Sequence, residues 1–278
     1  MYSKEIMRGG IIVKKTGRFW LFGVLLVSLS VALFGCGTKD SGSSTDVVEG
    51  EGETVRKLIV GTDAAYAPME SMDEKGNIVG IDIDIVKAIA DAAGFEVEFR
   101  NIGWEPLFPA VDNGEVDFGV SSITITEDRQ KSYDFTNPYF SANQLILVPE
   151  NSSVTSFADL KDKRVAVQIN TTGHIVTKEL LGKTSSKIVA AELMPLAITE
   201  MMNGNADAVV GDNAVIIDYM ANNPKVKMKT IEDASFEKEY YGLMVKKGNT
   251  EIVELLNEGI QIIKDNGKLK EITGFDLE

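Results

Sequence analysis

The sequence predicts an α/β fold of two similar lobes, and three observations support that prediction. Strand-like and helix-like segments alternate from Lys57 onward, which is the pattern of α/β domains. Residues 113–122 align with residues 203–212, since both read as a helix stop, a short turn, a strand and polar residues. The length of 278 residues and the hydrophobic content of 44% suffice for one large or two modest domains. Two unrelated helix-to-strand turns are the alternative explanation of the second observation.

The elements of the first half follow from apolar spacing and turn residues. Apolar side chains recur at helical spacing after Asp82 and stop at Gly94, and a half-buried alternation follows from Phe95. A short hairpin-like stretch is punctuated by residues 75–77. The expected elements, in chain order, are a strand over 58–60, a helix over 82–93, a strand over 95–99, a helix over 106–113 and a strand over 116–120.

The second half repeats this alternation after Asn143. Strand-like apolar runs again alternate with segments of helical spacing. The expected elements are strands over 144–148 and 164–168, helices over 172–181 and 196–202, and a buried strand over 206–210.

The N-terminus has the architecture of an export signal. Five basic residues precede a charge-free apolar run over 19–34, and the only cysteine, Cys36, follows a Leu-x-Gly triplet. This resembles the lipobox of bacterial lipoproteins and predicts a signal peptide over 1–35 with a lipid on Cys36. An uncleaved membrane anchor is the alternative. Residues 36–56, rich in Gly, Ser, Thr and acids, are expected to be a flexible tether.

The charge and the residue inventory exclude several classes of function. A formal charge of -14 argues against nucleic acid, which needs clustered Lys and Arg, but is compatible with a cationic ligand. The lone histidine, His174, reads as a helix-start residue, and it has no second histidine with which to hold a metal. No phosphate-cradling loop or nucleophile elbow is present. We therefore expect neither a metal nor another cofactor.

Polar residues follow corresponding strands in the two predicted lobes. Ser121 and Ser122 end one strand and Asp212 ends the other, and ligands bind at the carboxyl ends of strands in open α/β sheets. Arg129 lies nearby in a segment where Thr126 reads as a helix N-cap. Arginine offers a bidentate fork to a carboxylate, and Asp212 can pair with an ammonium. The pattern predicts that opposite walls grip the two charges of a free amino acid.

Four motifs resemble those of the polar amino acid-binding proteins of bacterial ABC importers: VGTDAAYAP (60–68), GIDID (80–84), ITITEDR (123–129) and ADAVVGD (206–212). The resemblance runs from about Lys57 to Glu278. It implies a periplasmic-binding-protein-like fold of type II, with two α/β lobes joined by a two-strand hinge around a central ligand cleft. The implied parts are lobe 1 over 57–141 and 238–278, lobe 2 over 142–237, and hinges near 140–143 and 237–241.

The resemblance also implies a set of ligand contacts. Arg129, with the backbone of Thr124 and Thr172, would bind the α-carboxylate, while Asp212 and the Ser122 region would bind the α-ammonium. The complete predicted set of ligand-binding residues is Asp63, Tyr66, Trp104, Ser121, Ser122, Thr124, Arg129, Thr171, Thr172 and Asp212.

Further stretches resemble binders of arginine, lysine or histidine: NIGWEPLF (101–108), VQINTTG (167–173), DNAV (212–215) and YYG (240–242). Asp63, leaving the first strand, can pair with a cationic side chain. Tyr66 and Trp104 can stack on that side chain, since a cation over an aromatic face is worth about 0.5–2 kcal/mol. Arginine is the expected ligand, followed by lysine and histidine. Glutamine or another polar amino acid is the alternative, because a carboxylate also accepts hydrogen bonds from an amide.

The expected function is that of an extracytoplasmic, lipid-anchored solute-binding protein. It would act as a monomer without enzymatic activity and would deliver its ligand to the permease and ATPase of an ABC importer. The main competing class is a dehydratase-like enzyme on the same scaffold, for which Asp63 or Glu70 would supply the acid or base. A sensor receptor is a further alternative, although the chain carries no kinase or cyclase segment.

Overall fold

The computed structural model describes residues 55–277. The predicted signal peptide over 1–35, the lipid site Cys36 and the tether up to residue 54 lie outside that range. Within it, none of the helices is both long enough and apolar enough to cross a membrane.

Lobe 1 is built on a five-stranded mixed sheet in the order β5-β1-β6-β15-β7. Its strands are β1 (Lys57–Thr62), β5 (Glu96–Asn101), β6 (Phe118–Gly119), β7 (Tyr133–Phe135) and β15 (Met244–Lys246). β1 is parallel to β5 and β6, whereas β15 is antiparallel to β6 and β7. Its parallel strands therefore end at one edge, where the chain enters the loops that carry Asp63 and Ser121.

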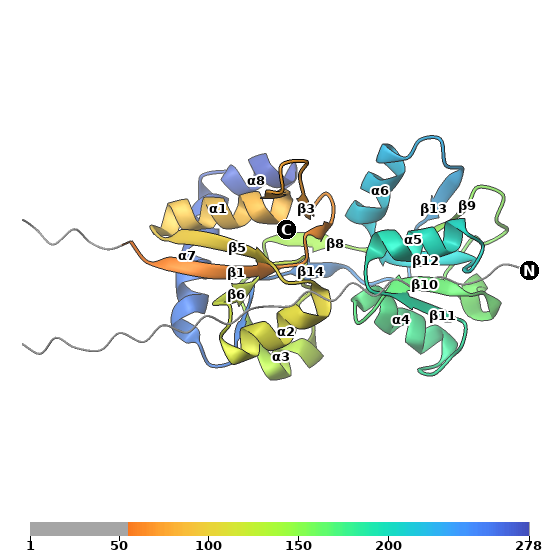
Figure 1. Ribbon diagram of the computed structural model, residues 1–278, viewed down its shortest axis with the longest axis horizontal. Helices are drawn as coiled ribbons and strands as arrows, with labels where there is room; N and C mark the ends of the chain where they lie inside the picture. The colour runs from red at the N-terminus through yellow and green to blue at the C-terminus, as the bar shows by residue number, and fades with distance from the viewer. Residues whose placement is uncertain (1–54, 278) are drawn as a thin grey trace, which may run out of the picture. The chain divides into compact units, whose positions relative to one another are not determined.

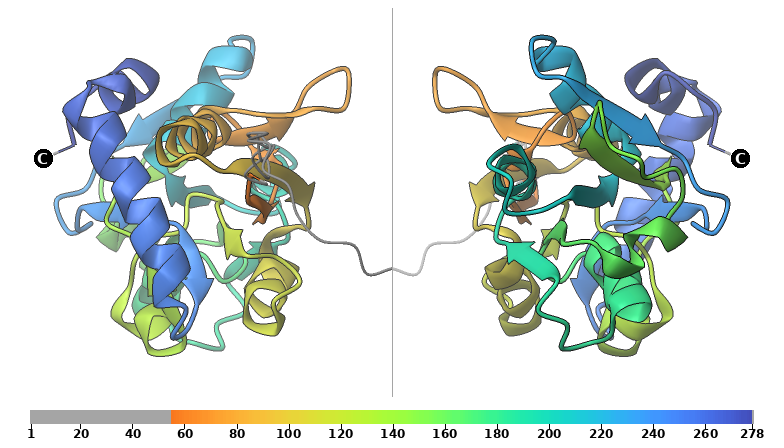
Figure 2. Two further views of the ribbon diagram at one scale, coloured as in Figure 1. Left: turned by 90° about the vertical axis from the view of Figure 1, so that its left-hand side faces the viewer. Right: turned by 90° about the vertical axis from the view of Figure 1, so that its right-hand side faces the viewer.

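Helices cover both faces of this sheet. They are α1 (Ile81–Ala93), α2 (Trp104–Asn113), α3 (Glu127–Ser132), α7 (Thr250–Asp265) and α8 (Lys268–Thr273). α1 and α8 lie on the side opposite to α2 and α3 (Figure 1), and α7 packs beside α1 and α8 (Figure 2). A small antiparallel sheet of β2 (Ala65–Tyr66), β3 (Glu70–Met72) and β4 (Ile78–Val79) follows β1. Its β3–β4 turn is the hairpin-like stretch expected around residues 75–77.

Lobe 2 repeats the same strand order, β11-β10-β12-β9-β13. Its elements are β9 (Gln144–Pro149), the 3-10 helix η1 (Ala158–Asp162), β10 (Val165–Gln168), α4 (Thr172–Leu181), β11 (Ile188–Ala191), α5 (Met194–Met202), β12 (Ala208–Asp212), α6 (Asn213–Asn222) and β13 (Met228–Ile231). β10 is parallel to β11 and β12, and β9 is antiparallel to β12 and β13. α4 and α5 cover opposite faces (Figure 1).

Two strands connect the lobes. β8 (Phe140–Ala142) and β14 (Glu239–Tyr241) form an antiparallel pair in which Tyr241 lies opposite Phe140. Their rings stack with centroids 5.5 Å apart, and the Tyr241 ring is fully buried. This pair coincides with the hinge segments expected from the sequence, and β14 carries Glu239 toward the site described below.

The expected elements are confirmed, with shifts at their ends. The aligned segments 113–122 and 203–212 contain β6 and β12, each the third strand of its sheet in the same order. α2 starts at Trp104, two residues before the expected start, because Gly103 has a φ of 87° that ends the preceding extended chain. β6 is shorter than the expected 116–120, since only Phe118 and Gly119 pair with both neighbours.

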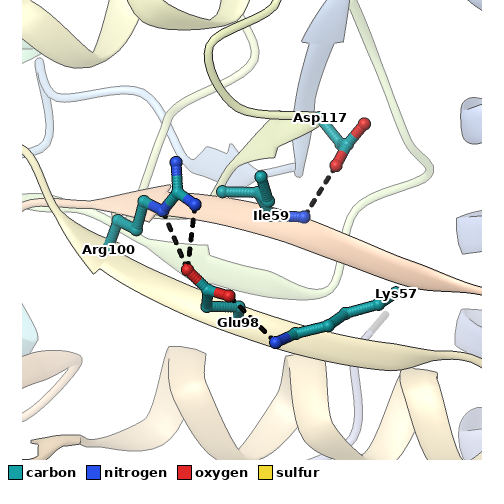
Figure 3. Close-up of polar contacts among 5 residues, drawn as sticks. All are labelled: Lys57, Ile59, Glu98, Arg100 and Asp117. Atoms are coloured by element: carbon teal, nitrogen blue, oxygen red, sulfur yellow. Dashed lines mark hydrogen bonds and ion pairs between the residues drawn. The ribbon is translucent and has the colours of Figure 1, made fainter. Parts of the chain in front are cut away.

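Polar contacts fix the outer end of the lobe 1 sheet (Figure 3). Asp117 Oδ2 accepts a hydrogen bond of 2.7 Å from the Ile59 backbone N–H, which ties the turn after α2 to β1. Glu98 pairs with Lys57 at 2.9 Å and with Arg100 at 2.9 Å. These side chains are more than 40% exposed, so each ion pair contributes at most about 1 kcal/mol. The backbone-linked Asp117 is the stronger constraint on register.

Gly259 lies where α7 packs tightly against α1. A Cβ atom at this position would lie 2.7 Å from Ile89 Cγ2 and 2.8 Å from the Ile89 carbonyl oxygen, so the helices would have to separate. We expect Gly259→Ala to lower the free energy of unfolding by about 1–3 kcal/mol, as overpacking does in other cores. Urea denaturation measures it. The exposed Glu258→Ala on the same helix is the control, and equal stability of the two variants would contradict this packing.

Candidate ligand-binding site

A cavity lies where the carboxyl ends of the parallel strands of both lobes meet. The cavity is narrow and partly open to solvent. Its lining consists of Asp63, Tyr66, Trp104, Ser121, Ser122, Thr124, Arg129, Gln168, Thr171, Thr172 and Asp212. All ten residues predicted from the sequence are among them, and Gln168 is the additional one. The structure thus brings the predicted set together, while its role in binding stays a prediction.

The lobe 1 wall is built from loops that follow β1 and β6. The backbone N–H of Asp63 donates to Ser121 Oγ at 3.2 Å, so the two loops are tied together. Asp63 is 4% exposed, and burial raises the pKa of its carboxyl. Ser122 adopts a left-handed φ of 49°, which is uncommon outside glycine, and its N–H donates to a buried acid, Asp82, at 2.7 Å.

Arg129 is held in place by its own helix and by aromatic rings. Thr126 caps α3 as expected, its Oγ1 accepting from the Arg129 N–H at 3.2 Å. The guanidinium lies 5.3 Å from the centre of the Trp104 ring and 5.5 Å from that of Phe108. Its Nη1 donates to the Thr124 carbonyl at 2.8 Å. Burial lowers the pKa of Arg129 to about 10, so it stays protonated at neutral pH.

The lobe 2 wall presents Asp212 at the end of β12. Its carboxylate is 4% exposed and accepts from Gln144 Nε2 at 2.6 Å and from the Tyr241 hydroxyl. Burial raises the pKa of Asp212, and these donors together with the positive charge of Arg129 oppose that rise. Asp212 therefore faces the Arg129 charge from the other lobe.

The start of α4 supplies the two predicted threonines. Thr171 is the N-cap: its Oγ1 accepts from the His174 N–H at 3.3 Å and donates to the Gln168 carbonyl at 2.8 Å. His174 Nδ1 accepts from the Asn170 N–H at 2.9 Å. The prediction that His174 is a helix-start residue is confirmed, since both of its contacts shape this turn.

Gln168 is a cavity residue that the sequence interpretation missed. It is 2% exposed, and its Nε2 donates to Asp63 Oδ2 across the lobes at 3.3 Å and to the Glu192 carbonyl at 3.1 Å. Its Oε1 has no hydrogen-bond partner among the described residues. Gln168 ends β10, so the strand-end rule that selected Asp212 would also have selected it.

Glu239 is a second missed residue, and it links the two lobes at the hinge. Its Oε2 accepts from Thr124 Oγ1 of lobe 1 at 2.7 Å and from Thr172 Oγ1 of lobe 2 at 2.8 Å. Its Oε1 accepts from Gln144 Nε2 at 3.0 Å. Burial, and then the charge of Asp212, raise the pKa of Glu239. The pairing register of β14 with β8 places the Glu239 side chain on the side that faces the cavity. That register cannot be predicted from the sequence.

The site carries more acid than base. Asp63, Asp212 and Glu239 are three buried or partly buried carboxyls, and Arg129 is the one cation among these four groups. Burial is the largest cause that raises the pKa of each acid. A cationic group in the cavity would favour their ionised forms. The described residues contain no group of side chains suited to a metal ion.

Comparison with known proteins gives a consistent result. Residues 58–274 match the bacterial extracellular solute-binding proteins, family 3. A probable histidine-binding protein of Neisseria gonorrhoeae is 38% identical over 91% of this chain and 93% of its own length. The arginine-binding extracellular protein ArtP of Bacillus subtilis is 30% identical over 91% of this chain and 95% of its own. The crystal structure of the arginine-, lysine-, histidine-binding protein ArtJ of Geobacillus stearothermophilus is similar with a TM-score of 0.77 and 44% identity, covering 80% of this chain and 97% of that one.

The bonds of Glu239 to both lobes can form together only when the lobes are closed. We expect Glu239→Ala to lower the ratio of closed to open molecules without ligand by at least about tenfold, because hydrogen bonds to charged groups contribute about 1.5–3 kcal/mol each. The measurement is single-molecule energy transfer between dyes on the exposed residues Asp91 and Lys183, each changed to cysteine in a Cys36→Ser background. Glu237→Ala, exposed on the same segment, is the control. If Glu239→Ala had the same ratio of closed to open molecules as the protein with Glu239 intact, the link that Glu239 forms between the lobes would be contradicted.

Proposed function

We propose, from the premise that this chain belongs to the bacterial extracellular solute-binding proteins of family 3, that it captures a basic L-amino acid and delivers it to an ABC importer. Arginine is the first choice of ligand, followed by lysine and histidine. The observation that supports this most directly is the cavity between Arg129 and Asp212, which come from different lobes and differ in charge. The family match and the equal strand orders of the two sheets confirm the predicted type II periplasmic-binding-protein fold.

A free amino acid needs one partner for each of its charges. In the proposed complex, the Arg129 guanidinium and the Thr124 and Thr172 segments bind the α-carboxylate, while Asp212 and the Ser122 region bind the α-ammonium. A charge that is buried away from water without a partner is costly. One wall alone would pair only one of the two charges of the ligand, so tight binding needs both walls. Binding would therefore favour closure of the lobes.

The side-chain pocket is proposed to select a cation. Asp63 supplies a carboxylate, and the Oε1 of Gln168 adds a neutral acceptor beside it. Tyr66 lines the same space. The ring of Trp104, which the sequence suggested as a platform for the ligand, lies against Arg129 and so also supports the carboxylate-binding side. A guanidinium offers five donors to these acceptors.

The names of similar proteins support a basic ligand. The relatives described above are named for binding arginine, lysine or histidine. Glutamine is the competing ligand, since Asp63 and Gln168 can also accept hydrogen bonds from an amide. The excess of acid at the site favours the cation over the amide.

The finer assignments are proposals as well. We place the mature protein outside the cytoplasm, attached to the cell membrane by a lipid on Cys36 and by the tether over 36–56. It would act as a monomer and would contact the permease, whose ATPase drives import. These assignments rest on the sequence of the N-terminus and on family membership.

Binding without turnover is proposed in preference to dehydratase-like catalysis. Of the two acids nominated for catalysis, Glu70 is fully buried, and Ser121 lies between it and the Asp63 backbone. Glu70 is absent from the residues that line the cavity. Incubation with cyclic hydroxy acids and with amino acids is expected to give stoichiometric binding of the latter and no product.

Removal of the Arg129 guanidinium would leave the α-carboxylate of a bound amino acid without its bidentate hydrogen-bond donor. We expect Arg129→Ala to weaken arginine binding by about 2–5 kcal/mol in titration calorimetry, as truncation of buried charge pairs does elsewhere. Lys131→Ala on the same helix is the control, because its side chain is 72% exposed and pairs with the exposed Asp128. Unchanged affinity in the Arg129 variant would refute the assignment.

Specificity is tested at Asp63 separately. Asp63→Asn removes the negative charge but keeps the shape, so it should weaken arginine much more than glutamine in the same calorimetric assay. Asp84→Asn, at an exposed position, is the control, because it removes one negative charge from the protein outside the cavity. Equal losses for both ligands would count against a cationic side-chain pocket.

A further inference from the structure

Two acids lie directly behind the Ser121–Ser122 wall of the cavity. Glu70 and Asp82 are both 0% exposed. Glu70 Oε1 accepts from Ser121 Oγ at 2.6 Å, and Asp82 Oδ2 accepts from the Ser122 N–H at 2.7 Å. The Tyr139 hydroxyl also donates to Asp82 Oδ2, at 2.9 Å. Each acid thus holds one of two consecutive residues of the candidate site.

The remaining oxygen of each acid has no other partner. Glu70 Oε2 and Asp82 Oδ1 are buried and lack a hydrogen-bond partner among the described residues. Neither acid forms an ion pair with a lysine, arginine or histidine in that part of the chain. The backbone N–H of Asp82 donates to the carbonyl of Met69, the neighbour of Glu70, at 2.9 Å, which brings the two acids side by side. Two ionised carboxylates in contact, away from water and without a cation, would repel strongly.

We propose that Glu70 and Asp82 share one proton, donated by Glu70 Oε2 to Asp82 Oδ1, and that this hydrogen bond makes them positioning residues for the Ser121–Ser122 wall. Glu70 carries the proton, since its Oε1 then remains an acceptor for Ser121. Asp82 carries the single negative charge, which its donors Ser122 N–H and Tyr139 O–H stabilise. The pair belongs to the wall that we assign to the ligand ammonium, so its effect on affinity rests on the proposed function.

The surroundings of the pair agree with this placement of the proton. Burial and the Asp82 charge raise the pKa of Glu70 well above its ordinary value, and the charge of Asp63 raises it further. Burial also raises the pKa of Asp82, to about 6, while its hydrogen bonds from Ser122 and Tyr139 act in the opposite direction. Among the described residues, the other titratable groups that interact with the pair are Asp63, Tyr66 and Tyr139.

The shared proton makes the wall dependent on pH. Because the folded protein holds a proton that the unfolded chain releases above the ordinary Glu pKa of 4.5, folding loses stability as pH rises from that value through the folded pKa. Above the pKa of Glu70 in the folded protein, the carboxylates of Glu70 and Asp82 repel each other. This repulsion would displace the segment that carries Ser121 and Ser122. Ligand affinity would then fall, because this segment forms one wall of the cavity.

Glu70→Gln tests the shared proton because its amide permanently supplies the N–H donor toward Asp82 and keeps the acceptor for Ser121. The unfolding equilibrium constant of the ligand-free protein is measured in urea between pH 5 and 9. Relative to Glu70→Gln, the wild-type constant should rise by up to tenfold per pH unit until the folded pKa is passed. Parallel profiles for the two proteins would overturn the proposal. Exposed Glu74→Gln should follow the wild type.

Two further measurements complete the test. Infrared spectra of the wild type at neutral pH should contain the carbonyl band of a buried protonated carboxyl that Glu70→Gln lacks, and its absence overturns the proposal even where the variant folds poorly. The dissociation constant for arginine should be equal in the wild type and in Glu70→Gln at pH 6. At pH 9 it should be several-fold larger in the wild type than in Glu70→Gln. A constant difference at all pH values would reduce Glu70 to a purely structural role. Failure of arginine to bind would refute the proposed function while leaving the ligand-free result intact.

Discussion

The need of buried charges for partners organises this protein. The charges of Asp212 and Glu239 act on a single buried guanidinium, that of Arg129, and the buried acid Asp63 lines the same cavity as Arg129. None of these groups is satisfied within its own loop alone, so the polar contacts extend from one lobe to the other. Gln168 reaches Asp63, and Glu239 joins Thr124 to Thr172. The cavity exists as a polar site only while both lobes contribute to it.

The scaffold places these groups by repetition. Each lobe uses the same strand order, and in each the second and third strands of that order end in loops that line the cavity. Apolar residues fill the sheets and their covering helices, while backbone turns such as the left-handed Ser122 aim the polar atoms. The sheets therefore fix where the loops begin, and hydrogen bonds from residues behind the cavity wall, such as those of Glu70 and Asp82, set the loop conformations.

Much of this arrangement could be predicted from the sequence, for identifiable reasons. Helical spacing and turn glycines located α1 and α4, and strand ends located Ser121 and Asp212. Resemblance to known motifs added Tyr66 and Trp104. Glu239 escaped prediction because the pairing register of a hinge strand decides which way its side chain points. The proposed pairing of Glu70 with Asp82 also escaped, because it depends on how β3 packs against α1.

The two lobes differ in how the chain completes them. The sheet of lobe 2 is made of one continuous stretch, residues 144–231, whereas that of lobe 1 needs β15, which comes after all of lobe 2. Contacts between β15 and β6 span more than a hundred residues, and such long loops are slow to close. A chain that leaves the ribosome N-terminus first can therefore complete lobe 2 before lobe 1. Lobe 1 would be the last part of the molecule to gain its full sheet, because β15 is made only when nearly the whole polypeptide is present.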